Sequence, residues 1–176
     1  MIIRNAQNKT KDCKLVFSLS NDSLVRSNSF NTKRIEYKEH CKWFEKTLED
    51  KNTLFFLVFA DESEKEFIGQ IRFKRECENS NECVISLSIT EQFRGRHIAK
   101  EFLELGISEL QMNWKNIDTI IAEVKDENIA SNKLFEKEGF KLVSRVNTYK
   151  LITCSSGGDE FTKLKINCNF SNKRVA

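Results

Sequence analysis

Residues 85–99 constrain the fold more than any other stretch, because they read as a strand, a turn and the start of a helix. From Ile85 to Ile89, apolar residues alternate with Ser86 and Ser88, which is the period of a strand with one apolar face. The very small polar residues on the other face indicate that something packs close against it. Beyond the turn, apolar residues recur near helical spacing from position 98 to position 110, which predicts a helix of roughly four turns.

The start of this helix carries arginines, whereas a helix N-terminus normally favours Asp or Glu. Arg94 and Arg96 flank Gly95, and a glycine lets a ligand approach the backbone closely. Free N–H groups at residues 95–99, beside two guanidinium groups, would bind a phosphate or a pyrophosphate. A solvated basic turn has the same composition, and the local sequence leaves both interpretations open.

The run QFRGRHIA at residues 92–99 resembles the pyrophosphate-binding loop of the GNAT acyltransferases, whose pattern is Arg or Gln, two residues, Gly, one residue, then Gly or Ala. Arg94 and Ala99 fit this pattern, and His97 stands where the pattern has Gly. Because a side chain restricts the backbone angles there, we expect either a re-formed loop or weaker CoA binding. The run NIASNKLFEKEGF at residues 128–140 is similar to the family helix beside the pantetheine arm.

The resemblance implies acetyl-CoA as the co-substrate, no metal ion, and direct transfer of the acetyl group to an amine without an acyl-enzyme. In the family the central strand bulges and splays from its neighbour, so that the cofactor enters the gap. Asn128 would contact the pantetheine arm, although a plain N-cap explains this residue equally well. The cofactor-binding residues implied by the resemblance are Ile89, Arg94, Gly95, Arg96, His97, Ile98, Ala99, Asn128, Ser131 and Phe135.

Two residues are predicted to act on the reacting groups. A backbone N–H near Leu87 would bind the thioester oxygen as negative charge develops. Glu123 interrupts an apolar strand next to the splayed one and is the candidate base, although an exposed carboxylate at a strand end has the same pattern. Phe135 stands where many relatives have a tyrosine that is thought to protonate the leaving thiolate. Water or another side chain must then supply that proton, or the thiolate leaves unprotonated.

The amino-terminal half, with NDSLVR at residues 21–26 and EHCKWF at residues 39–44, is similar to the GNAT branch that acetylates nucleotide-linked amino sugars in pseudaminic acid and related surface-glycan pathways. On this resemblance Arg26, His40 and Gln70 would contact the acceptor, with the guanidinium of Arg26 on a nucleotide phosphate. A surface ion pair and a packed histidine are the alternatives for Arg26 and His40. An N-terminal acetyltransferase of the ribosomal-protein type, a polyamine acetyltransferase and a non-catalytic CoA-binding module stay open as functions.

Composition bounds the class of protein and its partners. The 176 residues are 39% hydrophobic, which suits one domain spanning residues 1–176. A net charge of +3 is too small to indicate nucleic acid, and no apolar run is long enough for a membrane span. No signal peptide follows Met1, and six cysteines without a Cys-x-x-Cys pair indicate reduced thiols and no zinc. We therefore expect a cytoplasmic protein acting on a small-molecule amine, with a homodimer among the arrangements that the sequence allows.

The periodicities predict a mixed α/β fold of the GNAT type around one central sheet, in the order strand, two helices, three strands, helix, strand, helix, two strands. Gly69 inside a predicted strand indicates a bulge or a close approach of backbone. The predicted strands are residues 1–17, 54–60, 67–73, 85–89, 117–124, 140–151 and 160–170, with a hairpin turn at 155–158. The predicted helices are a short one near residues 24–26, then residues 36–50, 98–110 and 128–138.

Overall fold

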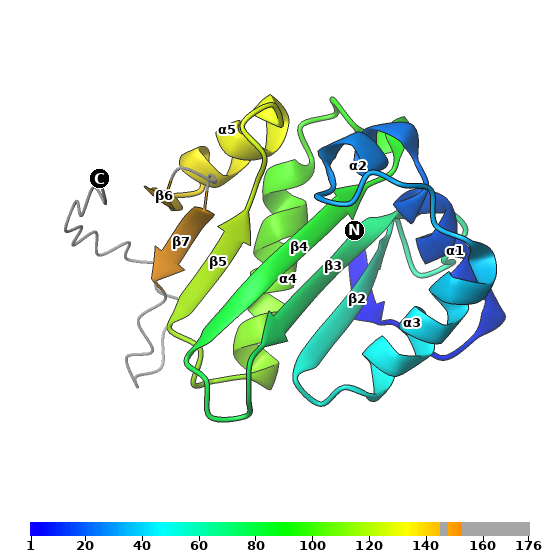
Figure 1. Ribbon diagram of the computed structural model, residues 1–176, viewed down its shortest axis with the longest axis horizontal. Helices are drawn as coiled ribbons and strands as arrows, with labels where there is room; N and C mark the ends of the chain where they lie inside the picture. The colour runs from blue at the N-terminus through cyan, green and yellow to red at the C-terminus, as the bar shows by residue number, and fades with distance from the viewer. Residues whose placement is uncertain (145–147, 153–176) are drawn as a thin grey trace.

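A computed structural model of the protein describes residues 1–144 and 148–152. Seven strands form one mixed sheet in the order β1-β2-β3-β4-β5-β7-β6 (Figure 1), which confirms the predicted fold class. The strands are β1 (Ile2–Asn5), β2 (Thr53–Phe59), β3 (Phe67–Arg75), β4 (Glu82–Ile89), β5 (Thr119–Glu123), β6 (Lys141–Ser144) and β7 (Thr148–Ile152). The helices are α1 (Thr10–Ser20), α2 (Ser23–Asn28), α3 (Tyr37–Glu49), α4 (Ala99–Asn113) and α5 (Ile129–Lys137), with a short 3-10 turn η1 (Glu91–Phe93).

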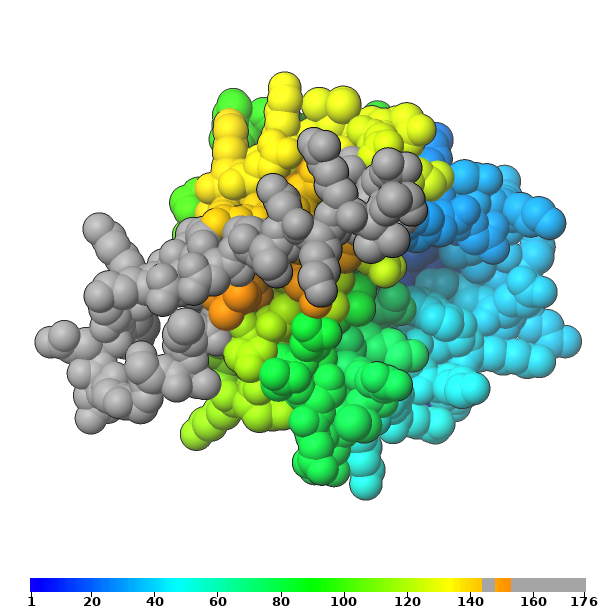
Figure 2. Space-filling view, turned by 60° about the vertical axis from the view of Figure 1, so that its left-hand side comes forward, coloured from blue at the N-terminus to red at the C-terminus, as the bar shows by residue number. Residues whose placement is uncertain are grey.

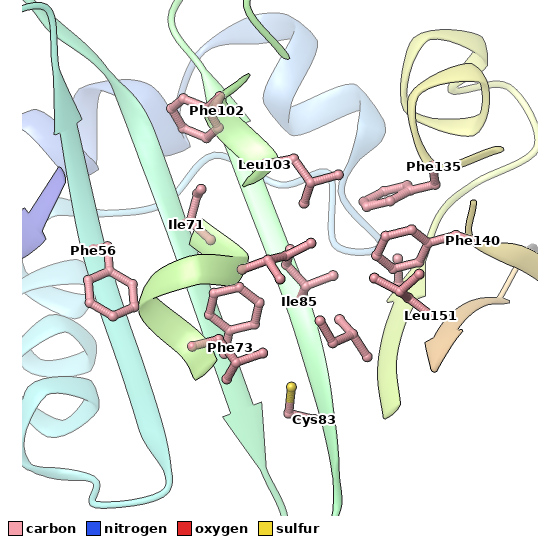
Figure 3. Close-up of a cluster of buried hydrophobic side chains, with 14 of the residues drawn as sticks. Phe56, Ile71, Phe73, Cys83, Ile85, Phe102, Leu103, Phe135, Phe140 and Leu151 are labelled. Atoms are coloured by element: carbon pink, nitrogen blue, oxygen red, sulfur yellow. The ribbon is translucent and has the colours of Figure 1, made fainter. Parts of the chain in front are cut away.

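Helices cover both faces of the sheet (Figure 1). Successive residues of a strand point to opposite faces, so Phe55 and Leu57 join a buried cluster with α1 and α3, whereas Phe56 joins the larger cluster under α4. Figure 3 shows part of the larger cluster, with Phe102 of α4 near the sheet. Burial of β2 on both faces explains its nearly unbroken apolar run.

The prediction of one long strand over residues 1–17 is wrong, because β1 ends at Asn5 and α1 begins at Thr10. The consecutive apolar residues Leu15, Val16 and Phe17 suggested a strand. In the structure the buried residues of this segment instead recur at helical spacing, at Cys13, Val16 and Leu19. Three helices therefore separate β1 from β2, where the sequence predicted two.

The carboxyl end of the sheet also differs from the prediction. Residues 140–151 were predicted as one strand, but they contain β6 and β7, which pair antiparallel with Lys141 opposite Lys150. Residues 145–147 carry neither Gly nor Pro, so the sequence offered no strong turn signal there. The predicted strand at 160–170 and the hairpin turn at 155–158 lie outside the described residues, as does part of the predicted single domain.

Gly69 confirms the prediction of both a bulge and a close approach. The register between β2 and β3 shifts beside it, because Val58 pairs with Gly69 and Phe59 pairs with Phe67. A Cβ at Gly69 would overlap the carbonyl oxygen of Ser88 and lie 3.1 Å from the Cα of Ile89. The absence of a side chain therefore lets β3 hold the last residues of β4 closely.

Gly69→Ala is expected to lower the free energy of unfolding by about 1–3 kcal/mol, since the backbone of β4 must move to admit the methyl group. Gly106→Ala on α4 is the comparison variant, because its Cβ would lie 2.5 Å from Cδ1 of Ile71 and so meet a side chain in place of backbone. Urea unfolding measures the stability of both variants. A stability of Gly69→Ala equal to that of the parent would contradict a backbone conflict at Gly69.

Candidate functional site

The central parallel pair of strands opens at one end. β4 pairs with β5 from Glu82 opposite Thr119 to Ile85 opposite Ala122. On its other side β4 stays paired with β3 as far as Ile89 opposite Gly69. Figure 1 shows the corresponding ends of β4 and β5 spread apart. Residues 86–89 therefore have a strand partner on one side only, and backbone N–H groups directed to the open side can meet a ligand.

The splay that the family resemblance implied is present, but a bulge in the central strand is absent within the described pairings. The register between β3 and β4 runs without a shift from Arg75 opposite Cys83 to Gly69 opposite Ile89. The irregularity lies one strand away, between β2 and β3. Leu87 and Ile89, assigned to the oxyanion and the cofactor, both lie in the open half of β4 and pack partly against the main core.

The loop after β4 has a left-handed backbone at two positions. Gly95 has a φ of 72° and His97 has a φ of 61°, a region that glycine adopts freely and that histidine visits more often than most residues. The loop thus keeps the backbone conformation that a glycine at position 97 would favour, at a cost of about 1 kcal/mol or more. α4 then begins at Ala99, after Ile98, and none of the described side chains caps its N-terminus, so the first N–H groups can bind an anion.

The two arginines of this loop have different surroundings. Nε of Arg94 donates to the carbonyl of Ile89 at 2.9 Å, and its Nη2 donates to Oδ1 of Asp22 at 2.7 Å. Arg96 is exposed, and its guanidinium carbon lies 5.1 Å from the ring centre of Phe93. Arg94 therefore stabilises the loop through bonds within the protein, and of the two arginines Arg96 is the one available to a ligand.

Asp22 links this loop to α2. Its carboxylate accepts hydrogen bonds from the backbone N–H groups of Leu24 and Val25 and so caps α2. Burial favours a raised pKa for Asp22, but the hydrogen bonds from Arg94 and from these amides hold the pKa below its ordinary value. At the far end of α2, Nζ of Lys125 donates to the carbonyl of Ser27 at 2.8 Å. α2 is thus fixed at one end to the segment after β4 and at the other to the segment after β5.

Arg26 on α2 holds the segment that follows the helix. Its guanidinium donates to the carbonyls of Asn31 and Lys33 and to the hydroxyl of Ser29. Its Nε is buried and has no hydrogen-bond partner in the described part of the chain, and burial lowers the pKa of this side chain. The structure therefore does not place Arg26 in a surface ion pair with any described carboxylate.

One face of the sheet brings three groups of polar residues together. Arg72 pairs with Ser86 and Gln70 pairs with Ser88 across β3 and β4, so these side chains share a face. Glu123 is exposed and directly follows Ala122, the last residue of β5 paired with β4, so by alternation it is on the same face as Ser86. Figure 2 shows a recess in the molecular surface where the regions of α2, β4 and the segment after β5 meet.

His40 does not belong to this face, and its assignment to the acceptor site is wrong. The side chain is only 1% exposed, and it lies between α1 and α3 near the rings of Phe17 and Trp43. Its Nε2–H donates to the carbonyl of Cys13 at 3.2 Å, and burial lowers its pKa. The packed-histidine alternative holds.

The residues assigned to the pantetheine helix divide into two kinds. The side-chain oxygen of Asn128 accepts a hydrogen bond from the N–H of Ser131 at 3.2 Å, so the N-cap interpretation is confirmed. The NH2 of the same side chain is the part left for a cofactor. Phe135 is buried against Phe140 and Tyr149, where it contributes to the core. A polar contact with a ligand is not available to its ring.

Two features of the site were not predicted from the sequence: the salt bridge between Asp22 and Arg94, and the position of Arg72 beside Trp43. An Asp directly before a short helix is a cap signal, but its partner 72 positions away is fixed only by the fold. The described residues contain no group of three His, Cys, Asp or Glu side chains suited to a metal ion. Among the described helices, none combines the length and the apolar character needed to cross a membrane.

An opened pair of parallel strands, followed by a left-handed loop and an uncapped helix N-terminus, can hold a pyrophosphate and admit an extended thioester arm. These features define the class of acyltransferases that take their acyl group from a CoA thioester. Residues 1–141 match the model of the acetyltransferase (GNAT) domain. The chain belongs to the GNAT acetyltransferase family, and it is an N-acetyltransferase with acetyl-CoA as its co-substrate.

Individual proteins of known sequence and structure are similar to this chain. The chain is 27% identical over 137 residues to acetyltransferase PseH of Campylobacter jejuni subsp. jejuni, covering 78% of this chain and 82% of the relative. The crystal structure of Campylobacter jejuni PseH matches with a TM-score of 0.64, 22% identity and coverage of 88% of this chain and 98% of that one.

Two structures with bound ligands are also similar in fold. Spermidine N-acetyltransferase from Vibrio cholerae, in complex with CoA and spermine, matches with a TM-score of 0.73, 17% identity and coverage of 86% of this chain and 94% of that chain. The acetyltransferase yncA from Salmonella typhimurium, with acetyl-CoA, matches with a TM-score of 0.70, 16% identity and coverage of 92% and 99%.

His97→Gly is expected to bind CoA as tightly as the parent or a few-fold more tightly, because glycine relieves the left-handed strain and clears space beside the anion. Gly95→Ala is the comparison variant, since its Cβ would meet no protein atom within 4 Å, and a loss of affinity there reports backbone strain or contact of the methyl group with the bound ligand. Calorimetric titration with CoA measures both. Clearly weaker binding by His97→Gly would show that the imidazole itself contacts the cofactor.

Proposed function

We propose that the protein transfers the acetyl group of acetyl-CoA to the amino group of a nucleotide-linked amino sugar. The observation that carries this choice is the polar face of β3, β4 and β5, which offers the cation of Arg72 and the carboxylate of Glu123. The other carboxylate on this face of the three strands, Glu82, is paired with Lys150. A polyamine carries several positive charges, and it would need several carboxylates at its site. Similarity to the Campylobacter PseH sequence supports the same choice.

The proposed cofactor site uses residues on the loop and on β4. The N–H groups at the start of α4, the left-handed turn at Gly95 and His97, and the guanidinium of Arg96 would hold the pyrophosphate. Acetyl-CoA supplies the thioester as acetyl donor. A backbone N–H of Leu87 or a neighbour in the open half of β4 would donate to the thioester oxygen as charge develops.

The amine would approach from the face that carries Glu123. Its nitrogen forms the new bond to the acetyl carbon as the carbon–sulfur bond breaks, and a proton leaves the nitrogen. Glu123 would accept this proton through a water, because its side chain is exposed on the face level with Ser86. Arg26 keeps its proposed place near the acceptor, since its Nε is buried without a partner among the described residues.

The other functions considered are less well supported. The hypothesis of a non-catalytic CoA-binding module is disfavoured because the chain belongs to a family of acetyltransferases. At 17% identity, the similarity to the spermidine enzyme supports a shared fold and not a shared acceptor. The cation of Arg72 also disfavours a polycation. An N-terminal acetyltransferase is tested by the acceptor panel below.

Release of the CoA thiol should be fast with a nucleotide-linked amino sugar and slow with spermidine and with an amino-terminal peptide. The physical reason is the guanidinium of Arg72 on the acceptor face, which has no ion-pair partner among the described residues and so attracts an anionic acceptor and disfavours a polycation. Steady-state kinetics with each acceptor, at matched ionic strength, give kcat/KM for the comparison. Efficient turnover of spermidine or of the peptide, with none of the amino sugar, would overturn the proposal.

Glu123→Gln is expected to lower kcat by about 10²-fold, the low end of general-base effects, and to leave the KM for acetyl-CoA nearly unchanged. Glu78→Gln, an exposed change in the turn before β4, is the control. Steady-state kinetics of the parent, Glu123→Gln and Glu78→Gln over a range of pH give kcat and the KM values for this comparison. Coincident pH profiles in height and shape would make Glu123 a structural carboxylate.

A further inference from the structure

Arg72 is a partly buried cation without an anionic partner in the described residues. Its guanidinium carbon lies 5.3 Å from the ring centre of Trp43, and it makes no hydrogen bond or ion pair with any described side chain or carbonyl. Burial lowers its pKa. Arg4 shows the contrast, since Asp12 and Glu64 both pair with its guanidinium. The Arg72 nitrogens are not among the buried polar atoms of the described residues, so a ligand can reach this guanidinium and supply the acceptor that the described residues do not.

The position of Arg72 relates it to the reacting groups. It lies opposite Ser86, the first residue of β4 beyond the last pairing with β5, and cross-strand neighbours stand about 5 Å apart. Two residues along the same face, Oε1 of Gln70 is buried without a hydrogen-bond partner among the described residues. A free set of donors and a free acceptor therefore adjoin the half of β4 that is open to the cofactor.

We propose that Arg72, oriented by its stacking on Trp43, binds an oxyanion of the acceptor, and that Gln70 accepts a hydrogen bond from a hydroxyl or N–H of the same molecule. A guanidinium binds a phosphate or a carboxylate through two parallel hydrogen bonds. The phosphate of a nucleotide-linked sugar and the carboxylate of a sugar acid both supply such an oxyanion. This inference rests on the proposed function, because it assigns a specificity residue to the same acceptor site.

A purely structural role for Arg72 is the competing explanation. Its methylene stem could simply cover apolar surface beside Trp43, which is a common use of arginine. Arg72→Met retains a stem of similar length and removes the charge, and Arg72→Lys retains the charge and removes the planar fork. Arg75→Met is the matched control, because Arg75 lies on the same strand and stacks on Trp114 at 4.2 Å, on the opposite face of the sheet.

The first experiment measures KM for four acceptors: a nucleotide-linked amino sugar, an amino sugar 1-phosphate, an amino-sugar acid, and the amino sugar with neither charge. We expect Arg72→Met to raise the KM of the acceptor that carries the correct oxyanion by tenfold or more, because hydrogen bonds to charged groups are the strong ones. The KM for acetyl-CoA and for the uncharged sugar should not change, and Arg72→Lys should lie between. The affected acceptor distinguishes phosphate from carboxylate.

The second experiment is a binding measurement that needs no turnover. The chain has two tryptophans, so Trp114→Phe leaves Trp43 as the only one. With CoA at saturation to occupy the loop at residues 94–99, addition of uridine diphosphate or of a sugar acid should change the fluorescence of Trp43. The change should vanish in Arg72→Met.

The two experiments separate the failure of each proposal. An unchanged KM in Arg72→Met for every charged acceptor, together with a fluorescence response that does not depend on Arg72, overturns the oxyanion site while the proposed function stands. If no amino sugar is acetylated but the fluorescence response requires Arg72, the oxyanion site stands and the proposed function fails. Equal effects of Arg72→Met and Arg75→Met on the acceptor KM would assign Arg72 to structure alone.

Discussion

The end of hydrogen bonding between β4 and β5 is the constraint on which the rest of the site depends. After Ile85 and Ala122 the two strands separate, and the backbone groups of residues 86–89 on that side have lost their strand partner. Such groups are costly to leave unsatisfied, and the separation can persist because β3 continues to hold β4 as far as Ile89. Gly69 makes that support close, since its missing side chain lets the two backbones approach. β4 and β5 can thus separate at one end of the sheet while β4 stays paired with β3.

α2 is bonded to the loop after β4 and to the segment after β5, and this changes the role of Arg94. Arg94 fits the loop pattern of the family, yet it bonds to Asp22 and to the carbonyl of Ile89. Its charge is therefore largely compensated within the protein, and the electrostatic attraction for an anion falls on Arg96 and on the N–H groups of α4. The same salt bridge joins α2 directly to the loop that we propose for the pyrophosphate.

Local periodicity predicted the parts of this fold whose burial follows one simple repeat. The alternation at residues 85–89 and the helical spacing after Ile98 became β4 and α4, because each element buries one face against the same core. The run at Leu15–Phe17 was misread since three adjacent apolar residues fit either a strand or a helix that packs on two sides. His40 could not be assigned from spacing, because only the packing of α1 on α3 decides that it is enclosed. The absence of a counter-ion for Arg72 among the described residues is likewise a property of three-dimensional neighbours and has no sequence signal.

The departure at Phe135 shows how catalytic demand is distributed over the proposed site. A ring packed on Phe140 and Tyr149 cannot deliver a proton to a leaving thiolate. A thiol with a pKa of about 8.5 is a fair leaving group without that help, and general acid catalysis contributes about 10²–10⁴-fold where it operates. Alignment of two bound reactants contributes considerably more, up to about 7–11 kcal/mol of the barrier. A site that lacks the tyrosine can therefore remain active if its acceptor is held firmly, and in the proposed site the groups that fix the acceptor beside the open half of β4 would carry more of the rate than any single proton donor.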